Sequence, residues 1–260
     1  MSGIATLSPD ALAALLQAII GFWLQYGGVF LRIGTAILVL PGLGEAAIPV
    51  RVRLAAALAL SLVIAPAVAG LPPGTSPWRL AAEPVVGLSL GLVLRLFVLA
   101  LTTAGAIIAQ SISLAQMFGG GAGEPQPAVG HLLTIGGLAI AFGAGLHLHL
   151  VEALILSYDA LPQGVVPTAG DMRSWGVAEV AHSFRLGLTL AAPFVIGSLL
   201  YNVALGVINR AMPQLMVSFI GAPALTLGGL ALLVLTVPVT LMLWQDRFAA
   251  FLANPFGGSP

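Results

Sequence analysis

The sequence predicts an all-α integral membrane protein with about six long, kinked apolar helices arranged as helical hairpins. Of its 260 residues, 59% are hydrophobic and only 7% are charged, and the mean hydropathy is +1.07. A soluble domain carries about 25% charged residues, because its surface faces water. A helix needs about 20 apolar residues to cross a membrane. Six stretches reach that length, at 11–40, 52–70, 80–116, 131–157, 182–209 and 215–245.

The charged residues exclude several function classes. The nine basic residues are all arginines, and nine acidic residues balance them to a formal net charge of zero. Nucleic-acid binding relies on clustered basic residues, and no such cluster is present. The chain has no cysteine, so it has neither disulfides nor thiolate metal sites.

The apolar stretches have recognisable ends, and some are longer than one crossing requires. Ser8 and Pro9 have the residue types of an N-cap and a first helical position. A continuous helix over 80–116 would be about 55 Å long, against a hydrocarbon core of about 30 Å. We therefore expect bends or breaks, for which the sequence offers Pro66, Pro84, Pro193, Pro223 and Pro238.

One membrane-embedded domain is predicted over residues 1–253. It would contain a Gly-rich loop at about 111–128 and a polar link at about 158–181, and residues 254–260 are predicted to be a disordered tail. The orientation stays open: with either placement, three loop arginines lie on each side, so the positive-inside rule does not choose.

Several charged residues lie inside the apolar stretches. A charge at the bilayer centre costs at least about 2.5–3.5 kcal/mol and usually faces a partner or a cavity. Arg95 has apolar runs on both sides, which favours a buried partner, whereas Arg185 lies near the start of its stretch, which favours snorkelling to the interface. Glu83, just before Pro84, is predicted to be a first-turn carboxylate at a helix N-terminus.

The histidines and the reactive side chains predict no catalysis, cofactor or metal. His147 and His149 are two residues apart and so point to different faces of a helix. His149 and Glu152 share a face, but two ligands make a poor metal site, so a structural or interfacial role is favoured. The sequence has no nucleophile motif, phosphate loop or dinucleotide fingerprint.

The Gly-rich segment has two open interpretations, a solvent linker or a mobile plug that closes a pore. Glycines give hinge freedom, and methionine is a soft apolar group that adapts to its surroundings. The residues of the plug hypothesis are Met117, Phe118, Gly119, Gly120, Gly121, Gly123, Glu124 and Pro125. Elsewhere, small residues four apart, Gly87 with Gly91 and Ala141 with Gly145, permit close approach of helices.

Motifs along nearly the whole chain resemble those of the FliR family, the membrane subunit of the flagellar type III export gate. The most specific one is Asn209-Arg210-Ala211-Met212-Pro213-Gln214-Leu215, followed by Gly221 and Pro223. Further likenesses are Arg32-Ile-Gly with the loop up to Arg53, the run from Glu83-Pro84 through Gly87 and Gly91 to Arg95, and Leu161-Pro162-Gln163-Gly164. Met216 stands where the family pattern has Asn.

This resemblance implies a subunit that packs with FliP and FliQ into a closed pore for unfolded flagellar proteins, and that hydrolyses nothing itself. It also implies that the loop near 111–128 is the plug, that FlhB-like and FlhA-like export components are partners, and that the chain lies in the bacterial inner membrane at the flagellar basal body. Membrane lipid is an expected partner and nucleic acid is not. The predicted assembly positions are Arg32, Glu83, Gly87, Gly91, Arg95, Glu152, Arg210, Pro213 and Gln214.

Two other functions stay open at this point. The first is an export-gate subunit of a virulence-type injectisome. The second is a stand-alone multi-pass transporter of a small solute, for which internal repeats with paired interruptions would be typical. No such repeat is visible at residue level.

Overall fold

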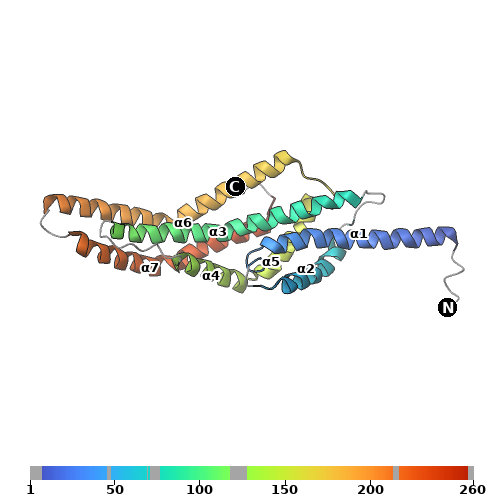
Figure 1. Cartoon of the computed structure of the whole chain (residues 1–260), viewed down its shortest axis with the longest axis horizontal. Coiled ribbons are helices and arrows are strands. Elements are labelled where there is room, and N and C mark those ends of the chain that lie inside the picture. Colours follow the sequence, from blue (N-terminus) through green and yellow to red (C-terminus); the bar gives the residue numbers. More distant parts are fainter. Residues whose placement is uncertain are drawn as a thin grey trace. The chain divides into compact units, whose positions relative to one another are not determined.

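The computed structural model describes residues 8–45, 48–68, 70, 77–117, 128–212 and 217–256, and every regular element within these ranges is a helix (Figure 1). The all-α fold class is thereby confirmed. The α-helices are α1 (Pro9–Val39), α2 (Val50–Ile64), α3 (Ala82–Met117), α4 (Ala128–Gly143), α5 (Leu146–Ala160), α6 (Ala169–Ala211) and α7 (Val217–Ala253), with short 3₁₀ helices η1 (Ala65–Ala67) and η2 (Pro77–Ala81).

Five helices in the described ranges are long and apolar enough to cross a membrane, and the broken pair α4–α5 makes up to six. The chain is a multi-pass membrane protein. Its first helix starts as predicted, because the Ser8 Oγ accepts a hydrogen bond from the backbone N–H of Ala11 (3.3 Å) and Pro9 occupies the first turn. The longest helix, α6, has 43 residues and measures about 65 Å at 1.5 Å per residue.

The break between α4 and α5 falls at a glycine, whereas α2 gives way to the 3₁₀ helix η1 at the predicted Pro66. Pro193 lies inside α6, and Pro223 and Pro238 lie inside α7, without ending either helix. Instead, α4 ends where Gly145 adopts φ 86°, and the Gly145 N–H donates to the carbonyl oxygen of Phe142 (3.1 Å). A left-handed residue just past the last turn ends a helix, and glycine adopts that conformation without steric penalty.

The predicted polar link over 158–181 is much shorter in the structure. Helix α5 continues to Ala160 and α6 begins at Ala169. The reason is a capping arrangement: the N–H of Asp171 donates to the Thr168 Oγ1 (3.2 Å), which in turn donates to the Asp171 carboxylate (2.6 Å). A Thr N-cap with an acidic residue three positions later starts a helix even in a polar segment.

Two other predicted boundaries also change. The Gly-rich loop loses both its ends, because 111–117 belong to α3 and Ala128 begins α4; residues 118–127 lie outside the described part. Of the predicted disordered tail, Pro255 and Phe256 pack on Trp175, and residues 257–260 lie outside the described part. The Trp175 Nε1 donates to the carbonyl oxygen of Pro255 (3.2 Å), and the Trp175 and Phe256 rings stack at 5.8 Å.

The chain divides into two compact units. Unit 1 comprises Met1–Arg95, His147–Gly176 and Leu252–Pro260, and unit 2 comprises Leu96–Leu146 and Val177–Phe251. That residues 1–253 act as one membrane-embedded domain stays a prediction.

In unit 1 the core lies around the C-terminal half of α1. Val29, Ile33 and Ile37 of this half are fully buried, and α1 packs against α2, η1 and η2. Figure 1 shows α2 alongside this half of α1. By contrast, residues 9–22 of α1 are exposed on all sides.

Unit 2 is an apolar helical bundle with α6 and α7 packed antiparallel. A Cβ at Gly197 would face Leu232, and one at Gly221 would meet Leu205, which fixes the register of this pair. The Trp244 Nε1 donates to the carbonyl oxygen of Phe97 in α3 (2.8 Å). Trp244 and Phe248 are fully buried at the centre of this aromatic packing.

Candidate functional site

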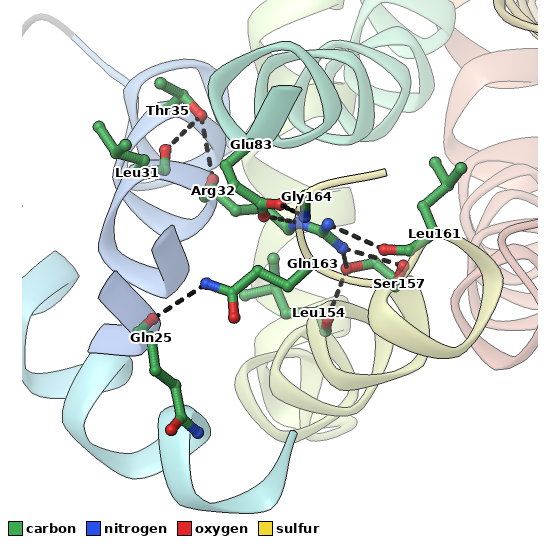
Figure 2. A network of polar contacts seen from close by, with 10 residues as sticks. All are labelled: Gln25, Leu31, Arg32, Thr35, Glu83, Leu154, Ser157, Leu161, Gln163 and Gly164. Atoms are coloured by element: carbon green, nitrogen blue, oxygen red, sulfur yellow. Dashed lines mark hydrogen bonds and ion pairs between the residues drawn. The ribbon is translucent and has the colours of Figure 1, made fainter. Parts of the chain in front are cut away.

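The most concentrated polar site in the described chain is a buried ion pair in unit 1 (Figure 2). The Arg32 Nε donates to the Glu83 Oε2 at 2.7 Å, and both side chains are 0% exposed. Arg32 lies within α1, and Glu83 lies in the first turn of α3. Because an isolated buried charge is very costly, each residue requires the other.

The Glu83 carboxylate has a second partner and a favourable helix end. Its Oε1 accepts the backbone N–H of Gly164 at 2.8 Å. Gly164 has φ 78°, a conformation that glycine adopts readily, and this turn directs its N–H at the carboxylate. The first turn of α3 also carries the positive end of the helix dipole, which stabilises a carboxylate there.

The Arg32 guanidinium binds the C-terminal end of a helix, whereas Glu83 lies at the N-terminal end of one. Its Nη1 donates to the carbonyl oxygen (3.0 Å) and the Oγ (3.1 Å) of Ser157, and its Nη2 donates to the carbonyl oxygen of Leu161 (2.9 Å). These acceptors are in and just after the last turn of α5, where backbone carbonyls carry partial negative charge. The Ser157 carbonyl oxygen also accepts the N–H of Leu161 (3.0 Å). The guanidinium carbon also lies 3.8 Å from the centre of the Tyr158 ring, a cation–π contact.

Two glutamines extend this network toward the end of α2. The Gln163 Nε2 donates to the carbonyl oxygen of Gln25 (3.0 Å), and the Gln25 Nε2 donates to the carbonyl oxygen of Ala65 (2.9 Å). A Cβ at Gly28 would collide with the Gln163 amide, so a larger residue there would displace this side chain from Gln25. The network thus connects α1, α2, α3, α5 and the 161–164 turn, all within unit 1.

Close packing of α3 on α1 supports the ion pair. A Cβ at Gly87 would overlap the carbonyl oxygen of Arg32, and a Cβ at Gly91 would overlap that of Ala36. Small residues four apart let the two backbones approach, which brings Glu83, one turn earlier, within reach of Arg32. Gly87 and Gly91 do permit the close approach of two helices that the sequence predicts. The two helices, α3 and α1, belong to this same chain, so the contact is not one between subunits.

The arrangement offers stability rather than reactivity. The charged atoms of the pair are used in hydrogen bonds, and the network holds no nucleophile with a neighbouring base. The Tyr158 hydroxyl and the Gln163 Oε1 find no hydrogen-bond partner among the described residues. In the same part of the chain, no three His, Asp or Glu side chains converge as metal ligands.

The structure places the other predicted assembly residues apart from this network. Glu152 is exposed and pairs with His149 on the same face of α5, at 3.1 Å. Arg95 is half-buried, and no hydrogen bond or ion pair to its side chain is present within the described residues. Arg210 is exposed in the last turn of α6. Pro213, Gln214 and residues 118–125 lie outside the described part, and Met117 is the last residue of α3.

Arg32 and Glu83 present no surface to another subunit, because both are fully buried. Any effect they have on assembly must act through the fold of unit 1. Both residues are candidates from the sequence, but their pairing is not predicted, and neither is the part played by Ser157, Tyr158 and the backbone groups of Leu161 and Gly164. The Leu161-Pro162-Gln163-Gly164 motif was the available signal, since three of its four residues bond to the network or its extension.

The chain is a multi-pass membrane protein by class. It has long apolar helices, one broken helix pair, and a buried ion pair held at two helix ends. A family model described as bacterial export proteins, family 1, matches residues 23–251. The chain belongs to this family.

Named relatives agree with this assignment. The chain is 37% identical over 233 residues to the flagellar biosynthetic protein FliR of Caulobacter vibrioides, covering 86% of this chain and 92% of that relative. It is 27% identical over 248 residues to FliR of Escherichia coli K12, covering 90% and 94%. It is 29% identical over 229 residues to FliR of Aquifex aeolicus, covering 85% and 88%.

Proposed function

We propose that this chain is a membrane subunit of the flagellar type III protein export apparatus. The observation that carries the proposal is the family match over 23–251, together with relatives of nearly equal length that are named flagellar biosynthetic proteins. In this proposal the chain lies in the bacterial inner membrane at the flagellar basal body and catalyses no reaction.

Within that apparatus, the chain would assemble with FliP-like and FliQ-like subunits into a closed pore, next to FlhB-like and FlhA-like components. Unfolded flagellar proteins would pass through the pore. The buried network supports this role physically, because it fixes the positions of α1, α3 and α5 without a partner chain. The exposed residues 9–22 of α1, apolar except for Asp10 and Gln17, supply surface that a neighbouring helix can cover.

Co-purification from native membranes tests the assembly. The chain, tagged at its C-terminus and produced from its own locus, is extracted with mild detergent, and the co-eluting proteins are identified by mass spectrometry. FliP-like and FliQ-like subunits are expected in the eluate. A well-behaved monomer that transports a small solute after reconstitution would overturn the proposal, as would normal filaments in a deletion strain.

The plug hypothesis for the Gly-rich loop has its own test. Deleting residues 119–123 is expected to increase ion leak across the membrane of cells that carry the assembled gate, because the loop could no longer close the pore. The control is the same deletion in a strain that lacks the FliP-like subunit, where no gate assembles and no leak is expected. Unchanged conductance in the assembled gate would count against a plug.

A further inference from the structure

Three buried polar groups around the Arg32 guanidinium have no hydrogen-bond partner within the described residues. Two of them are the Tyr158 hydroxyl and the Gln163 Oε1. The third belongs to Arg32 itself. A guanidinium has five N–H groups, and the side chain of Arg32 makes four hydrogen bonds to the described part of the chain. One N–H of a buried cation is therefore left over.

Bulk solvent does not reach these groups. Arg32 is 0% exposed, Gln163 is 4% exposed and Tyr158 is 6% exposed. A buried polar group without a partner loses its hydration and gains nothing in return, and the large majority of buried polar groups in proteins are paired with protein or with ordered water. Three such groups in one network therefore call for a common explanation.

The three groups surround the same side chain. The centre of the Tyr158 ring lies 3.8 Å from the guanidinium carbon of Arg32. The Arg32 Nη2 donates to the carbonyl oxygen of Leu161 at 2.9 Å, and Gln163 follows two residues later in the same turn. A Cβ at Gly28, one turn before Arg32 in α1, would meet the Gln163 amide. Figure 2 shows this amide with its nitrogen turned toward Gln25, so its oxygen takes no part in that contact.

The chemistry of the three groups selects what can join them. The guanidinium N–H can only donate, the Gln163 Oε1 can only accept, and the Tyr158 hydroxyl can do both. An anion would be repelled by the Gln163 oxygen and by the neighbouring Glu83 carboxylate, and a cation would be repelled by the guanidinium. A small neutral molecule that both accepts and donates satisfies all three. Water has this property, and a buried water typically makes about three hydrogen bonds.

We propose that one ordered water molecule is bound beside Arg32, where it accepts from the free guanidinium N–H and from the Tyr158 hydroxyl and donates to the Gln163 Oε1. The water completes the hydrogen bonding of the ion-pair network. It also ties the 161–164 turn to α5 and α1. This inference rests on unit 1 alone and does not depend on the proposed export role.

The three tyrosines of the chain form a matched set for the first test. Tyr158→Phe removes the hydroxyl that the water would bind and should lower the ratio of folded to unfolded chain about 2-fold to 10-fold. Tyr201→Phe is the positive control, because its hydroxyl donates to the carbonyl oxygen of Gly221 (2.8 Å). Tyr26→Phe is the negative control, because its half-buried hydroxyl has no hydrogen bond within the described residues.

The ratio is measured by SDS denaturation of the full-length chain in mixed micelles, followed by tryptophan fluorescence. A loss for Tyr158→Phe like that of Tyr201→Phe means that the Tyr158 hydroxyl has a partner. No change, or a gain in the folded fraction, means that the hydroxyl is unpaired and would overturn the proposal, since an unpaired hydroxyl is better removed.

A double-variant cycle tests whether one molecule is shared. Tyr158→Phe with Gln163→Met should be at least about 2-fold less destabilised than the product of the two single effects, because either variant alone already disrupts the water. Tyr158→Phe with Gln25→Met is the control and should be multiplicative, because the Gln25 side chain binds the carbonyl oxygen of Ala65 instead. Independent effects of Tyr158 and Gln163 would contradict a shared water.

An experimental density map separates a water from a direct contact between the two side chains. The map is recorded on the full-length chain, with any subunits that co-purify, at a resolution that shows ordered water. A peak within hydrogen-bonding distance of the Tyr158 hydroxyl, the Gln163 Oε1 and the Arg32 guanidinium is expected. Its absence, with the three side chains resolved, would overturn the proposal.

Discussion

The two units of this chain are similar in size but are stabilised by different means. Six of the nine arginines and six of the nine acidic residues belong to unit 1, and unit 2 has three of each. Unit 1 uses a buried ion pair that caps two helix ends, whereas unit 2 uses glycine contacts, aromatic packing and side-chain hydrogen bonds to backbone carbonyls.

This difference teaches where a membrane protein can place charge. A buried ion pair is favourable only when its remaining donors and acceptors are satisfied, and unit 1 provides helix ends and a turn for that purpose. Unit 2 has an apolar belt without charged residues, formed by residues 96–117, 186–209 and 217–245 of three helices. Because these helices are continuous through the belt, they offer few free backbone groups. In a bundle of uninterrupted helices, close packing and local hydrogen bonds replace ionic contacts.

Breaking the ion pair is expected to have the largest effect. Arg32→Met leaves the Glu83 carboxylate buried without its cation and should lower the free energy of unfolding by about 3–5 kcal/mol. Denaturation by SDS in mixed micelles, followed by tryptophan fluorescence, measures this loss. Glu83→Ala should in addition reduce the yield of any co-purified complex.

The double variant Arg32→Met with Glu83→Gln is the control for coupling. It should be less destabilised than the sum of the single variants Arg32→Met and Glu83→Gln, measured in the same way, by about 0.5–3 kcal/mol. Strictly additive losses would show that the two side chains do not act as a pair.

Introducing one arginine into each unit should show that the two sites have different surroundings, because the two variants should differ in membrane insertion. Val234 in unit 2 and Val50 in unit 1 are 75% and 72% exposed, so an arginine fits sterically at both. Val234→Arg places a charge in the apolar belt and should disfavour membrane insertion by about 2.5–3.5 kcal/mol. Val50→Arg, beside Arg51, should stay within about 0.5 kcal/mol of the native chain. The membrane-integrated fraction of each variant is the readout, and equal loss in both would remove the distinction.

Close glycine contacts are expected to matter in both units to a similar, smaller degree. Gly87→Ala in unit 1 and Gly105→Ala in unit 2 each add a Cβ that meets backbone atoms, of Arg32 and of Gly130 respectively. Overpacking of this kind costs about 1–3 kcal/mol, measurable by the same SDS denaturation. Gly21→Ala has open space around it and should be neutral or stabilising by up to about 1 kcal/mol. A loss at Gly21 equal to the others would point to a helix-wide effect instead of packing.

The smallest effect is expected at the hydrogen bond of Trp244. Trp244→Phe keeps an aromatic ring but removes the donor to the Phe97 carbonyl oxygen, which should cost about 0.5–1.5 kcal/mol. The exposed Trp23→Phe is the matched control and should show almost no change in the melting temperature of the detergent-solubilised chain. Equal shifts for both variants would contradict a specific role for this bond.

Much of the fold could be predicted from local patterns. Ser8-Pro9 marked the start of α1, and Glu83 marked the first turn of α3. The mixed composition of residues 169–181 predicts a link, although Thr168 and Asp171 carry a capping signal. The break at Gly145 was not foreseen, because proline is the stronger sequence signal, yet neighbouring helices can compensate for a proline within an apolar bundle.

The candidate site could be predicted only in part. Arg32 and Glu83 stood out because charges in apolar stretches are costly. Their pairing joins residues 51 positions apart, and the contacts to Ser157 and Leu161 join residues more than 120 positions apart. Backbone carbonyls and an N–H complete the network. Because every residue has a carbonyl and nearly every residue has an N–H, no residue type in the sequence indicates which of them take part.

The sequence by itself determined that this chain is a multi-pass helical membrane protein of the export family, because apolar length, scarcity of charge and local motifs are properties of consecutive residues. Only the tertiary structure decided which charges are buried, which glycines bring α3 onto α1, and which aromatic side chains lie at the centre of unit 2. The physical reason is that burial and pairing depend on distances between helices, and the hydrophobic pattern of one helix does not specify those distances.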